Sequence, residues 1–435
     1  MKGIESIKNN LKNPLVSKSI NVLFLRITGM LLFFGLTLFL TNNYDASYVG
    51  QYDFSRALLI FLGGICVFGM HQAVIYYSGY LKAHDSLPYL KKVYGKMVVI
   101  VLVLATLFFL TITFLNPKLI DKLFDKEVSR LVINSVFVLF FYGITLLNID
   151  VFRAINKIYI SEIYRNVLRY ALFFGAILVL YFTNNPQYLV EVFLLNFLFL
   201  GVISTLYLFY YFSKTKTIES SIDISYKDIV KRSGPMAISA ITYLLMQSMD
   251  IILLTKYSSF EQVAYYSVAI KLTTILSLVL ASVNTVYAPT FAEWYSLKDF
   301  KSLKSGIKKS TRLIFILTFP AILVVLLFSN FILGLFGSEY TTAKSALIVL
   351  LVGQAVNALC GSVGVYMNMT GKQVVFQRIL NTAFAINVTL NLILIPKYDI
   401  LGAAIATSIS TIFWNILTTI YIYRKDNIST FLTLK

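Results

Sequence analysis

The chain has 435 residues, of which 58% are hydrophobic and 13% are charged. Soluble globular domains average about 25% charged residues, so this composition excludes an ordinary soluble protein. The formal net charge of +18 does not by itself indicate a nucleic-acid partner, because the basic residues follow the pattern of a membrane protein.

Apolar runs of about 20 residues recur along the whole chain and predict transmembrane helices. We expect twelve such helices, at 20–41, 54–80, 93–115, 131–152, 166–183, 188–212, 235–256, 263–288, 312–333, 343–367, 374–395 and 401–423. The runs are continuous and do not alternate with polar residues, which excludes a β-barrel. The predicted fold class is therefore all-α and integral to a membrane.

The predicted helices divide into two lobes of six. Residues 1–18 are polar and basic, are not typical of a cleaved signal peptide, and form a cytoplasmic segment before the first lobe, 19–212. A polar cytoplasmic linker, 213–232, leads to the second lobe, 233–423, and 424–435 is a cytoplasmic tail. This organisation places both termini on the same side of the membrane.

The basic residues orient the chain. With both termini in the cytoplasm, most of the 38 Lys and Arg residues fall in inner segments, as the positive-inside rule requires. These basic segments also favour contact with anionic lipids of the inner leaflet.

The two halves resemble each other at a spacing of 214 to 215 residues. The matched pairs are Tyr48–Tyr52 with Gln262–Tyr266, Arg56 with Lys271, and Phe152–Lys157 with Met367–Lys372. Because six spans is an even number, both halves have the same orientation, which makes a parallel repeat about an axis normal to the membrane. Transporters built from such repeats place their site near the bilayer midplane between the halves.

Three basic residues fall inside predicted spans: Arg26, Arg56 and Lys271. A charge at such depth costs about 2.5–3.5 kcal/mol on insertion scales, so it indicates a functional site. We interpret these residues as the binding site for an anion. The alternative is that their long side chains reach to the membrane surface, which is hardest to reconcile with the depth of Lys271.

Neutral polar residues follow one side of three predicted helices. They are Tyr243 and Gln247 on the seventh helix, Thr274 on the eighth, and Gln354 and Asn357 on the tenth. Their helical spacing predicts that they line a wet cavity and contact the substrate there. The alternative interpretation is that they form hydrogen bonds between helices, a common use of polar residues in membranes.

Asp250 and His71 are further candidates within the spans. Asp250 is expected either to bind a coupling ion or to pair with Lys271 or Arg56. His71 is expected either to relay a proton or to act as a hydrogen-bonded packing residue. For Asp150 we expect a local ion pair with Arg153, three residues further along the chain.

Motifs of catalysis are missing from the sequence. It contains no Gly-rich phosphate loop, no HExxH and no nucleophile elbow, so we predict a protein that is not an enzyme and has no cofactor. Cys66 and Cys360 stand apart in different helices and form no metal or redox motif.

Several local motifs, in their order along the chain, resemble the multidrug/oligosaccharidyl-lipid/polysaccharide exporter superfamily, and its polysaccharide-transport branch in particular. They are Tyr48–Tyr52, Gly234-Pro235, Asp250 before an apolar run, Val263–Lys271, Ala288-Pro289, Met369–Lys372, Asn391–Pro396 and Gly402–Thr407. Together with the six-plus-six spans they cover nearly the whole chain. The related peptidoglycan-precursor flippases also carry basic residues on helices 1, 2 and 8, where Arg26, Arg56 and Lys271 stand here.

The resemblance implies a V-shaped exporter fold of two lobes and a cationic central cavity. It implies a flippase that moves undecaprenyl-pyrophosphate-linked oligosaccharide from the inner to the outer leaflet of the bacterial cytoplasmic membrane, for O-antigen, capsule or exopolysaccharide synthesis. Membrane lipids, a polysaccharide polymerase and chain-length machinery are the implied partners, and nucleic acid is not. Transport would proceed by alternating access, driven by a proton gradient, a sodium gradient or downhill flow. The alternative is a drug/cation antiporter of the same superfamily, whose cavity would carry acidic residues.

Overall fold

The protein is helical throughout the part of the chain that the computed structural model describes, residues 14–84, 86–215 and 223–432. Most of the predicted N-terminal segment and the last three residues of the predicted tail lie outside this part. Nine of the described helices are long and apolar enough to cross a membrane, or ten if the bent pair Ser129–Phe137 and Leu139–Ala154 forms one span. The prediction of a multi-pass, all-α membrane protein is confirmed at this level, and the count of twelve stays a prediction.

The chain folds into two compact units, each described here by itself. Unit 1 consists of the residues up to Tyr44 together with Leu58–Leu244, and unit 2 consists of Asp45–Ala57 together with Leu245–Lys435. The units therefore do not coincide with the two halves of the sequence. The chain passes from one unit to the other three times: between Tyr44 and Asp45, and inside two helices, α3 (Ala46–Val67) and α12 (Tyr226–Tyr257).

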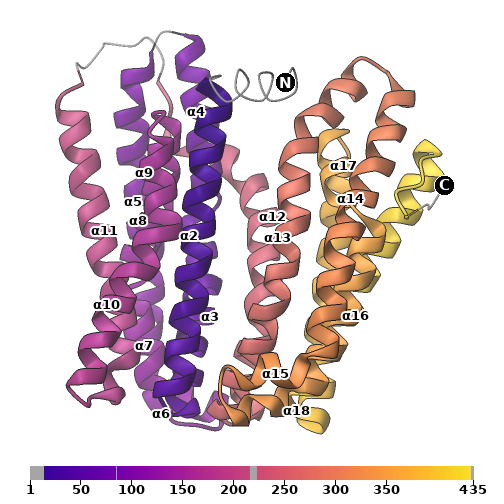
Figure 1. The fold of residues 1–435 in the computed structure, drawn as a ribbon. Coiled ribbons are helices and arrows are strands. Elements are labelled where there is room, and N and C mark those ends of the chain that lie inside the picture. Colours follow the sequence, from indigo (N-terminus) through magenta and orange to yellow (C-terminus); the bar gives the residue numbers. More distant parts are fainter. Residues whose placement is uncertain (1–13, 85, 216–222, 433–435) are drawn as a thin grey trace, which may run out of the picture. The chain divides into compact units, whose positions relative to one another are not determined.

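Unit 1 is a bundle of long helices (Figure 1). Its remaining elements are α2 (Pro14–Asn43), α4 (Met70–Ala83), η1 (Leu87–Tyr89), α5 (Leu90–Phe114), α6 (Pro117–Phe124), α7 (Ser129–Phe137), α8 (Leu139–Ala154), α9 (Ile158–Glu162), the π-helical η2 (Ile163–Leu168), α10 (Arg169–Phe182), η3 (Pro186–Tyr188) and α11 (Leu189–Ser213). Helix α8 lies at the centre, packed against α4, α5, α9 and α11, while α2 covers α9, η2 and α10.

Unit 2 is built around α16. Its elements, besides the shared α3 and α12, are α13 (Phe260–Ser296), α14 (Phe300–Leu327), α15 (Ser329–Gly334), η4 (Ser338–Ala343), α16 (Lys344–Cys360), α17 (Val363–Met369) and α18 (Gln373–Asp426). Helix α16 packs against α13, α14 and α18. Two predicted spans, 374–395 and 401–423, lie within α18, which bends at the non-helical residue Asp399 just after Pro396.

A break interrupts the second predicted span. Phe68 and Gly69 have φ values of 46° and 70° between α3 and α4, a left-handed conformation that glycine adopts without strain. A Cβ atom at Gly69 would lie 2.6 Å from the backbone nitrogen of Ala237 and 2.7 Å from the carbonyl oxygen of Ser233. The glycine therefore allows the turn and also lets the first part of α12 approach closely.

The predicted repeat has a local structural counterpart. After α8, the backbone N–H of Lys157 donates to the carbonyl of Phe152 at 2.8 Å, and after α17 the N–H of Lys372 donates to the carbonyl of Met367 at 2.9 Å. Each closure contains one left-handed residue, Asn156 or Gly371, as in the Schellman motif that ends helices. The two matched sequence segments thus fold into the same helix end.

The predicted linker 213–232 needs a correction at its second end. Helix α12 begins at Tyr226, so the last part of the predicted linker is helical and Gly234-Pro235 lies inside the helix rather than opening it. Hydrogen bonds hold the end of the linker against the rest of unit 1. Asp223 accepts hydrogen bonds from Tyr89 at 3.0 Å and from Lys96 at 3.4 Å. Lys96 also donates to the carbonyl of Ile224 at 2.6 Å.

Candidate functional site

Lys271 forms a buried ion pair in unit 2. Its Nζ lies 2.8 Å from one carboxylate oxygen of Asp53 and 3.0 Å from the other, and the second contact has hydrogen-bond geometry. The two side chains are 5% and 0% exposed. Helix α13 supplies the lysine and the unit 2 part of α3 supplies the aspartate. A charge pair this deeply buried has exchanged its hydration for contacts within the protein.

Aromatic groups and a second cation surround this pair. The Tyr52 ring centroid is 5.7 Å from the Lys271 Nζ, and Arg56 lies close enough for its positive charge to act on the lysine. The buried ring of Tyr340, whose charge environment includes Asp53, packs 5.1 Å from the ring of Tyr265. The structure thus places Arg56 within electrostatic reach of Lys271 and pairs the lysine with Asp53, a carboxylate that is not among the residues singled out from the sequence.

Close packing at the start of the two helices holds this geometry. A Cβ atom at Gly50 would lie 1.8 Å from the carbonyl oxygen of Phe260, so α3 approaches the first turn of α13 as closely as a glycine permits. The rings of Phe54 and Phe260 pack beside this contact, with centroids 6.5 Å apart.

Arg26 is held differently, in unit 1. Its Nε and Nη2 donate to the two carboxylate oxygens of Glu162, each at 3.1 Å, which is the bidentate geometry that arginine favours. Asn166 donates to the same carboxylate at 2.8 Å. The Arg26 side chain is 48% exposed while that of Glu162 is 4% exposed. The carboxylate is therefore enclosed and the guanidinium keeps an open side.

A second arginine of unit 1 stands next to this pair. Arg165 donates through Nη2 to Asp150 at 2.5 Å, with the arginine side chain 39% exposed. The predicted local pair of Asp150 with Arg153 is therefore wrong: the partner comes from the π-helical segment η2 and not from the same helix. His71 lies within electrostatic reach of both Asp150 and Arg165, which brings the predicted histidine into the cluster.

Asp250 lies in unit 2 among neutral polar groups. Its carboxylate accepts hydrogen bonds from Tyr266 Oη at 3.0 Å, from Asn391 Nδ2 at 2.6 Å and from the Thr407 hydroxyl. The predicted pairing with Lys271 or Arg56 is therefore wrong, because the partners of this carboxylate are neutral and Lys271 pairs with Asp53 instead. The side chain of Asn391 is buried, and its Oδ1 has no hydrogen-bond partner among the described residues. Oxygen atoms of four side chains thus gather in one enclosed place.

The neutral candidates fall into two groups. Gln354 Oε1 accepts from Ser277 Oγ and Asn357 Nδ2, both at 3.3 Å, so part of this set forms hydrogen bonds between α13 and α16. Thr274 is exposed and donates to the carbonyl of Ile270 in its own helix at 2.9 Å. Gln247 is exposed, and the side chain of Tyr243 lies outside the described part of the chain.

Asp53, Glu162 and Arg165 escaped the sequence analysis because the predicted spans began too late. All three lie just before the predicted spans 54–80 and 166–183, whereas the helices that contain these spans start at Ala46 and Ile158. Extending each span by two turns would have placed two carboxylates and one more arginine inside the membrane.

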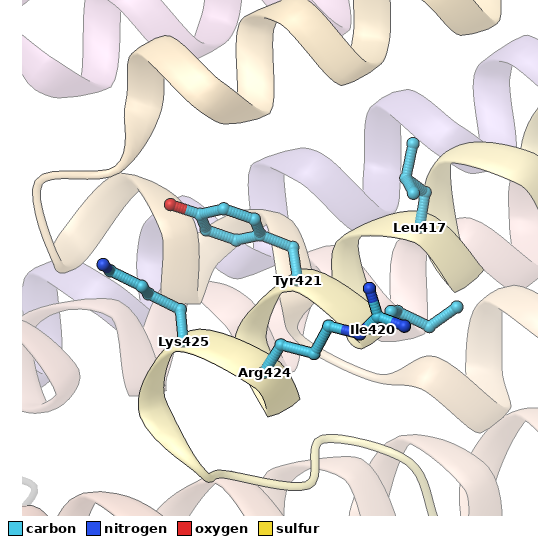
Figure 2. A pocket seen from close by; sticks show the side chains of 5 residues that line it. All are labelled: Leu417, Ile420, Tyr421, Arg424 and Lys425. Atoms are coloured by element: carbon cyan, nitrogen blue, oxygen red, sulfur yellow. The ribbon is translucent and has the colours of Figure 1, made fainter.

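A shallow hollow on unit 2 lies at the end of α18 (Figure 2). It is lined by Leu417, Ile420, Tyr421, Arg424 and Lys425. The mixture of aliphatic, tyrosine and basic side chains is typical of the level of lipid headgroups. None of the predicted site residues lines it. Among the described residues, no three His, Cys, Asp or Glu side chains gather into a metal-binding group.

The family comparison bears on the second half of the chain. Residues 235–393 match the MatE family model. The resemblance predicted from the sequence is thereby confirmed. The MatE segment contains α13, α14 and α16, and with them Lys271, Asp250 and the polar group of Gln354.

Curated relatives match parts of the chain. A probable low-salt glycan biosynthesis flippase, Agl15 of Haloferax volcanii, is 31% identical over 166 residues, which is 37% of this chain and 34% of that protein. A putative O-antigen transporter of Shigella flexneri is 29% identical over 220 residues, 49% of this chain and 52% of that protein. The matches thus span between a third and about half of the length of these relatives.

Solved structures resemble the chain over nearly its full length. The lipid II flippase MurJ in an inward closed conformation has a TM-score of 0.73 at 16% identity, covering 93% of this chain and 87% of that one. A multidrug resistance MATE family transporter of the MOP superfamily, facing inward, has a TM-score of 0.70 at 14% identity, covering 92% and 98%. At this identity the comparison establishes the fold alone, which the chain shares with these two transporters.

Proposed function

We propose that the protein is a flippase that moves an undecaprenyl-pyrophosphate-linked oligosaccharide from the inner to the outer leaflet of a bacterial cytoplasmic membrane. The observation that carries the proposal is the set of arginine and lysine side chains inside helices able to span a membrane. Arg26 carries most weight, because about half of its side chain is exposed. The names of the two curated relatives, a glycan biosynthesis flippase and an O-antigen transporter, support the same substrate class and a transporter rather than an enzyme.

The physical task explains the need for cations. A diphosphate carries charge that a bilayer core strongly disfavours, while arginine offers paired N–H donors for phosphate oxygens and lysine offers a point charge. Neutral groups such as Gln354, Asn357, Thr274, Gln247 and Tyr243 would solvate sugar hydroxyls. In this proposal both termini are cytoplasmic, two six-helix lobes alternate in exposing the cations to each side, and the polyprenyl tail stays in lipid.

Asp250 is our proposed site of ion coupling. Its carboxylate, the Tyr266 and Thr407 hydroxyls and the unpartnered Asn391 oxygen supply the oxygen donors that a sodium ion prefers, and the carboxylate could instead carry a proton. Replacing Asp250 with Asn should abolish the response of transport to a sodium or proton gradient while leaving downhill exchange measurable. An unchanged response in that variant would contradict ion coupling at this residue.

The flippase proposal is tested by translocation in liposomes. Purified protein is reconstituted with undecaprenyl-diphosphate-linked oligosaccharide, and the glycan that becomes accessible to an external glycosidase is measured. Arg26, Arg56 and Lys271 are replaced singly by Ala and by the other basic residue. We expect each Ala variant to lose most of the transport. Normal transport by all three Ala variants, at normal protein levels, would overturn the proposal.

A drug/cation antiporter is the second candidate, favoured by the TM-score of 0.70 to a multidrug transporter. Its substrate would be a lipophilic cation, so an acidic residue would have to be accessible to it. Asp250, Asp53 and Glu162 are all enclosed, which argues against this role. Efflux of a cationic dye by the same liposomes, without translocation of the lipid-linked glycan, would favour the antiporter.

A further inference from the structure

The π-helical segment η2 (Ile163–Leu168) is the starting point for a further site in unit 1. A π-helical turn is rare, and such turns occur often at functional sites. It separates α9 from α10 and carries Arg165 and Asn166, directly after Glu162. Through these residues one segment reaches two neighbouring helices: Glu162 bonds to Arg26 on α2, and Arg165 bonds to Asp150 on α8.

The cluster has more positive than negative groups. The charge environment of Glu162 includes three guanidinium groups, those of Arg26, Arg165 and Arg153. The carboxylates that face them are Glu162 and Asp150, and His71 adds a group that can become positive. An uncompensated charge within a membrane protein is costly, so an anion that binds beside these arginines would be strongly stabilised.

Arg165 has donors to spare for such an anion. A guanidinium carries five N–H groups, and the hydrogen bond to Asp150 uses Nη2. The Nε atom of Arg165 is buried and has no hydrogen-bond partner among the described residues, while part of the side chain remains exposed. A buried N–H without a partner costs about 1–3 kcal/mol, so Asp150 alone does not satisfy this guanidinium, and the exposed part of the side chain is where an anion can reach it.

We propose that Arg165 binds a phosphate of the diphosphate headgroup, with Asp150 as its positioning residue. The inference rests on the proposed flippase function and adds a binding residue to it. Asp150 fixes one edge of the guanidinium, so that the remaining donors keep a defined direction. A diphosphate fits this arrangement better than a monophosphate, because Arg26, which bonds Glu162 within electrostatic reach of Arg165, offers a second cation.

The test measures binding to the full-length protein in nanodiscs. The probe is undecaprenyl diphosphate, with undecaprenyl monophosphate, inorganic pyrophosphate and phosphatidylglycerol as competitors. We expect Arg165→Gln to weaken diphosphate binding by roughly tenfold or more and Arg165→Lys to weaken it less, since lysine keeps the charge but not the paired donors. Asp150→Asn should reduce the preference for diphosphate over monophosphate, a change that a merely structural role would not produce.

The matched control is Arg130→Gln, because Arg130 is also in unit 1 and also bonds one carboxylate, that of Glu191 at 2.6 Å. Its binding should equal that of the wild type. If Arg165→Gln fails to fold, the double variant Asp150→Asn/Arg165→Gln replaces the ion pair with two neutral amides and should show the same loss of binding.

Three results distinguish a failure of this inference from a failure of the proposed flippase function. Wild-type protein that neither binds nor translocates the undecaprenyl diphosphate probe would overturn the flippase proposal. Wild-type transport together with unchanged binding by Arg165→Gln and the double variant would overturn the inference alone. Competition by phosphatidylglycerol as strong as that by inorganic pyrophosphate would also overturn it, since the site would then recognise anionic lipid in general.

Discussion

Lys271 in unit 2 and Arg26 in unit 1 are both cations in membrane helices, and the structure holds them in opposite ways. The lysine and its Asp53 partner are almost fully enclosed, whereas Arg26 keeps about half of its side chain exposed above an enclosed Glu162. In the first site the structure encloses both the carboxylate and the cation. In the second site the carboxylate is enclosed and the cation is about half exposed.

The contrast separates two uses of charge. A buried pair contributes little net stability, since desolvation opposes the attraction, but removing one partner leaves an uncompensated charge. We therefore assign the Lys271–Asp53 pair a structural role, which is to hold the start of α3 against α13. The Arg26 and Arg165 pairs leave donors available, so we assign ligand binding first to unit 1.

The largest effect is expected from breaking the enclosed pair. Asp53→Asn leaves the Lys271 ammonium without a countercharge and should destabilise the protein by about 3–5 kcal/mol. The measurement is thermal unfolding of the purified protein together with its level in the membrane. The double variant Asp53→Asn/Lys271→Met removes both charges and should recover most of the loss. Equal stability of wild type and Asp53→Asn would contradict the assignment of this pair as structural.

The glycine contact beside the pair should give the next largest effect. In Gly50→Ala the new methyl group would overlap the carbonyl oxygen of Phe260 at 1.8 Å, and forced packing of this kind costs about 1–3 kcal/mol. Gly79→Ala is the matched control, because nothing lies within 4 Å of a Cβ atom there and alanine favours the helix. A melting temperature lowered at position 50 and unchanged or raised at 79 is the expected result.

The open pair should show a smaller loss of stability. Glu162→Gln removes the charge partner of Arg26 but keeps hydrogen-bonding atoms, and we expect a cost of about 1 kcal/mol because the arginine remains in contact with solvent or lipid headgroups. Affinity for inorganic pyrophosphate should rise, since the guanidinium is no longer neutralised. The contrast between the enclosed pair and the exposed pair would be wrong if Glu162→Gln destabilised the protein as much as Asp53→Asn does.

The smallest effect concerns the linker end on unit 1. Hydrogen bonds from Tyr89 and Lys96, and the positive charge of Lys96, hold the pKa of Asp223 below its ordinary value. Its contribution to the docked linker is therefore complete at neutral pH and is lost as the pH falls through that lowered value. At neutral pH, Tyr89→Phe should raise hydrogen exchange around 223–226 by about twofold. In the wild type, exchange referenced to an unstructured peptide should increase in acid and show no change between pH 6 and 8.

The sequence predicted the class of the protein because membrane insertion depends on local composition. Continuous apolar runs, basic inner loops and the repeated Phe152–Lys157 and Met367–Lys372 segments are properties of the chain itself, and the last two fold into matching helix ends. The three basic residues Arg26, Arg56 and Lys271 were also visible from composition alone.

Their partners were not visible in the same way. Asp53 is separated from Lys271 by more than 200 positions, and Glu162 from Arg26 by 136, so the pairing depends on which helices pack together. The mistaken pair of Asp150 with Arg153 came from considering neighbours within α8 alone, whereas the separate π-helical turn η2 brings Arg165 to that carboxylate.

The sequence by itself determined that apolar helices cross a membrane and that a few cations accompany them, because hydropathy is decided residue by residue. The tertiary structure decided which cations are enclosed and which are presented. That depends on close approach between distant helices, at Gly50 for α3 and α13 and at η2 for α2 and α8. The solvation of a charge depends on the groups that surround it, and those surroundings form only when the chain folds.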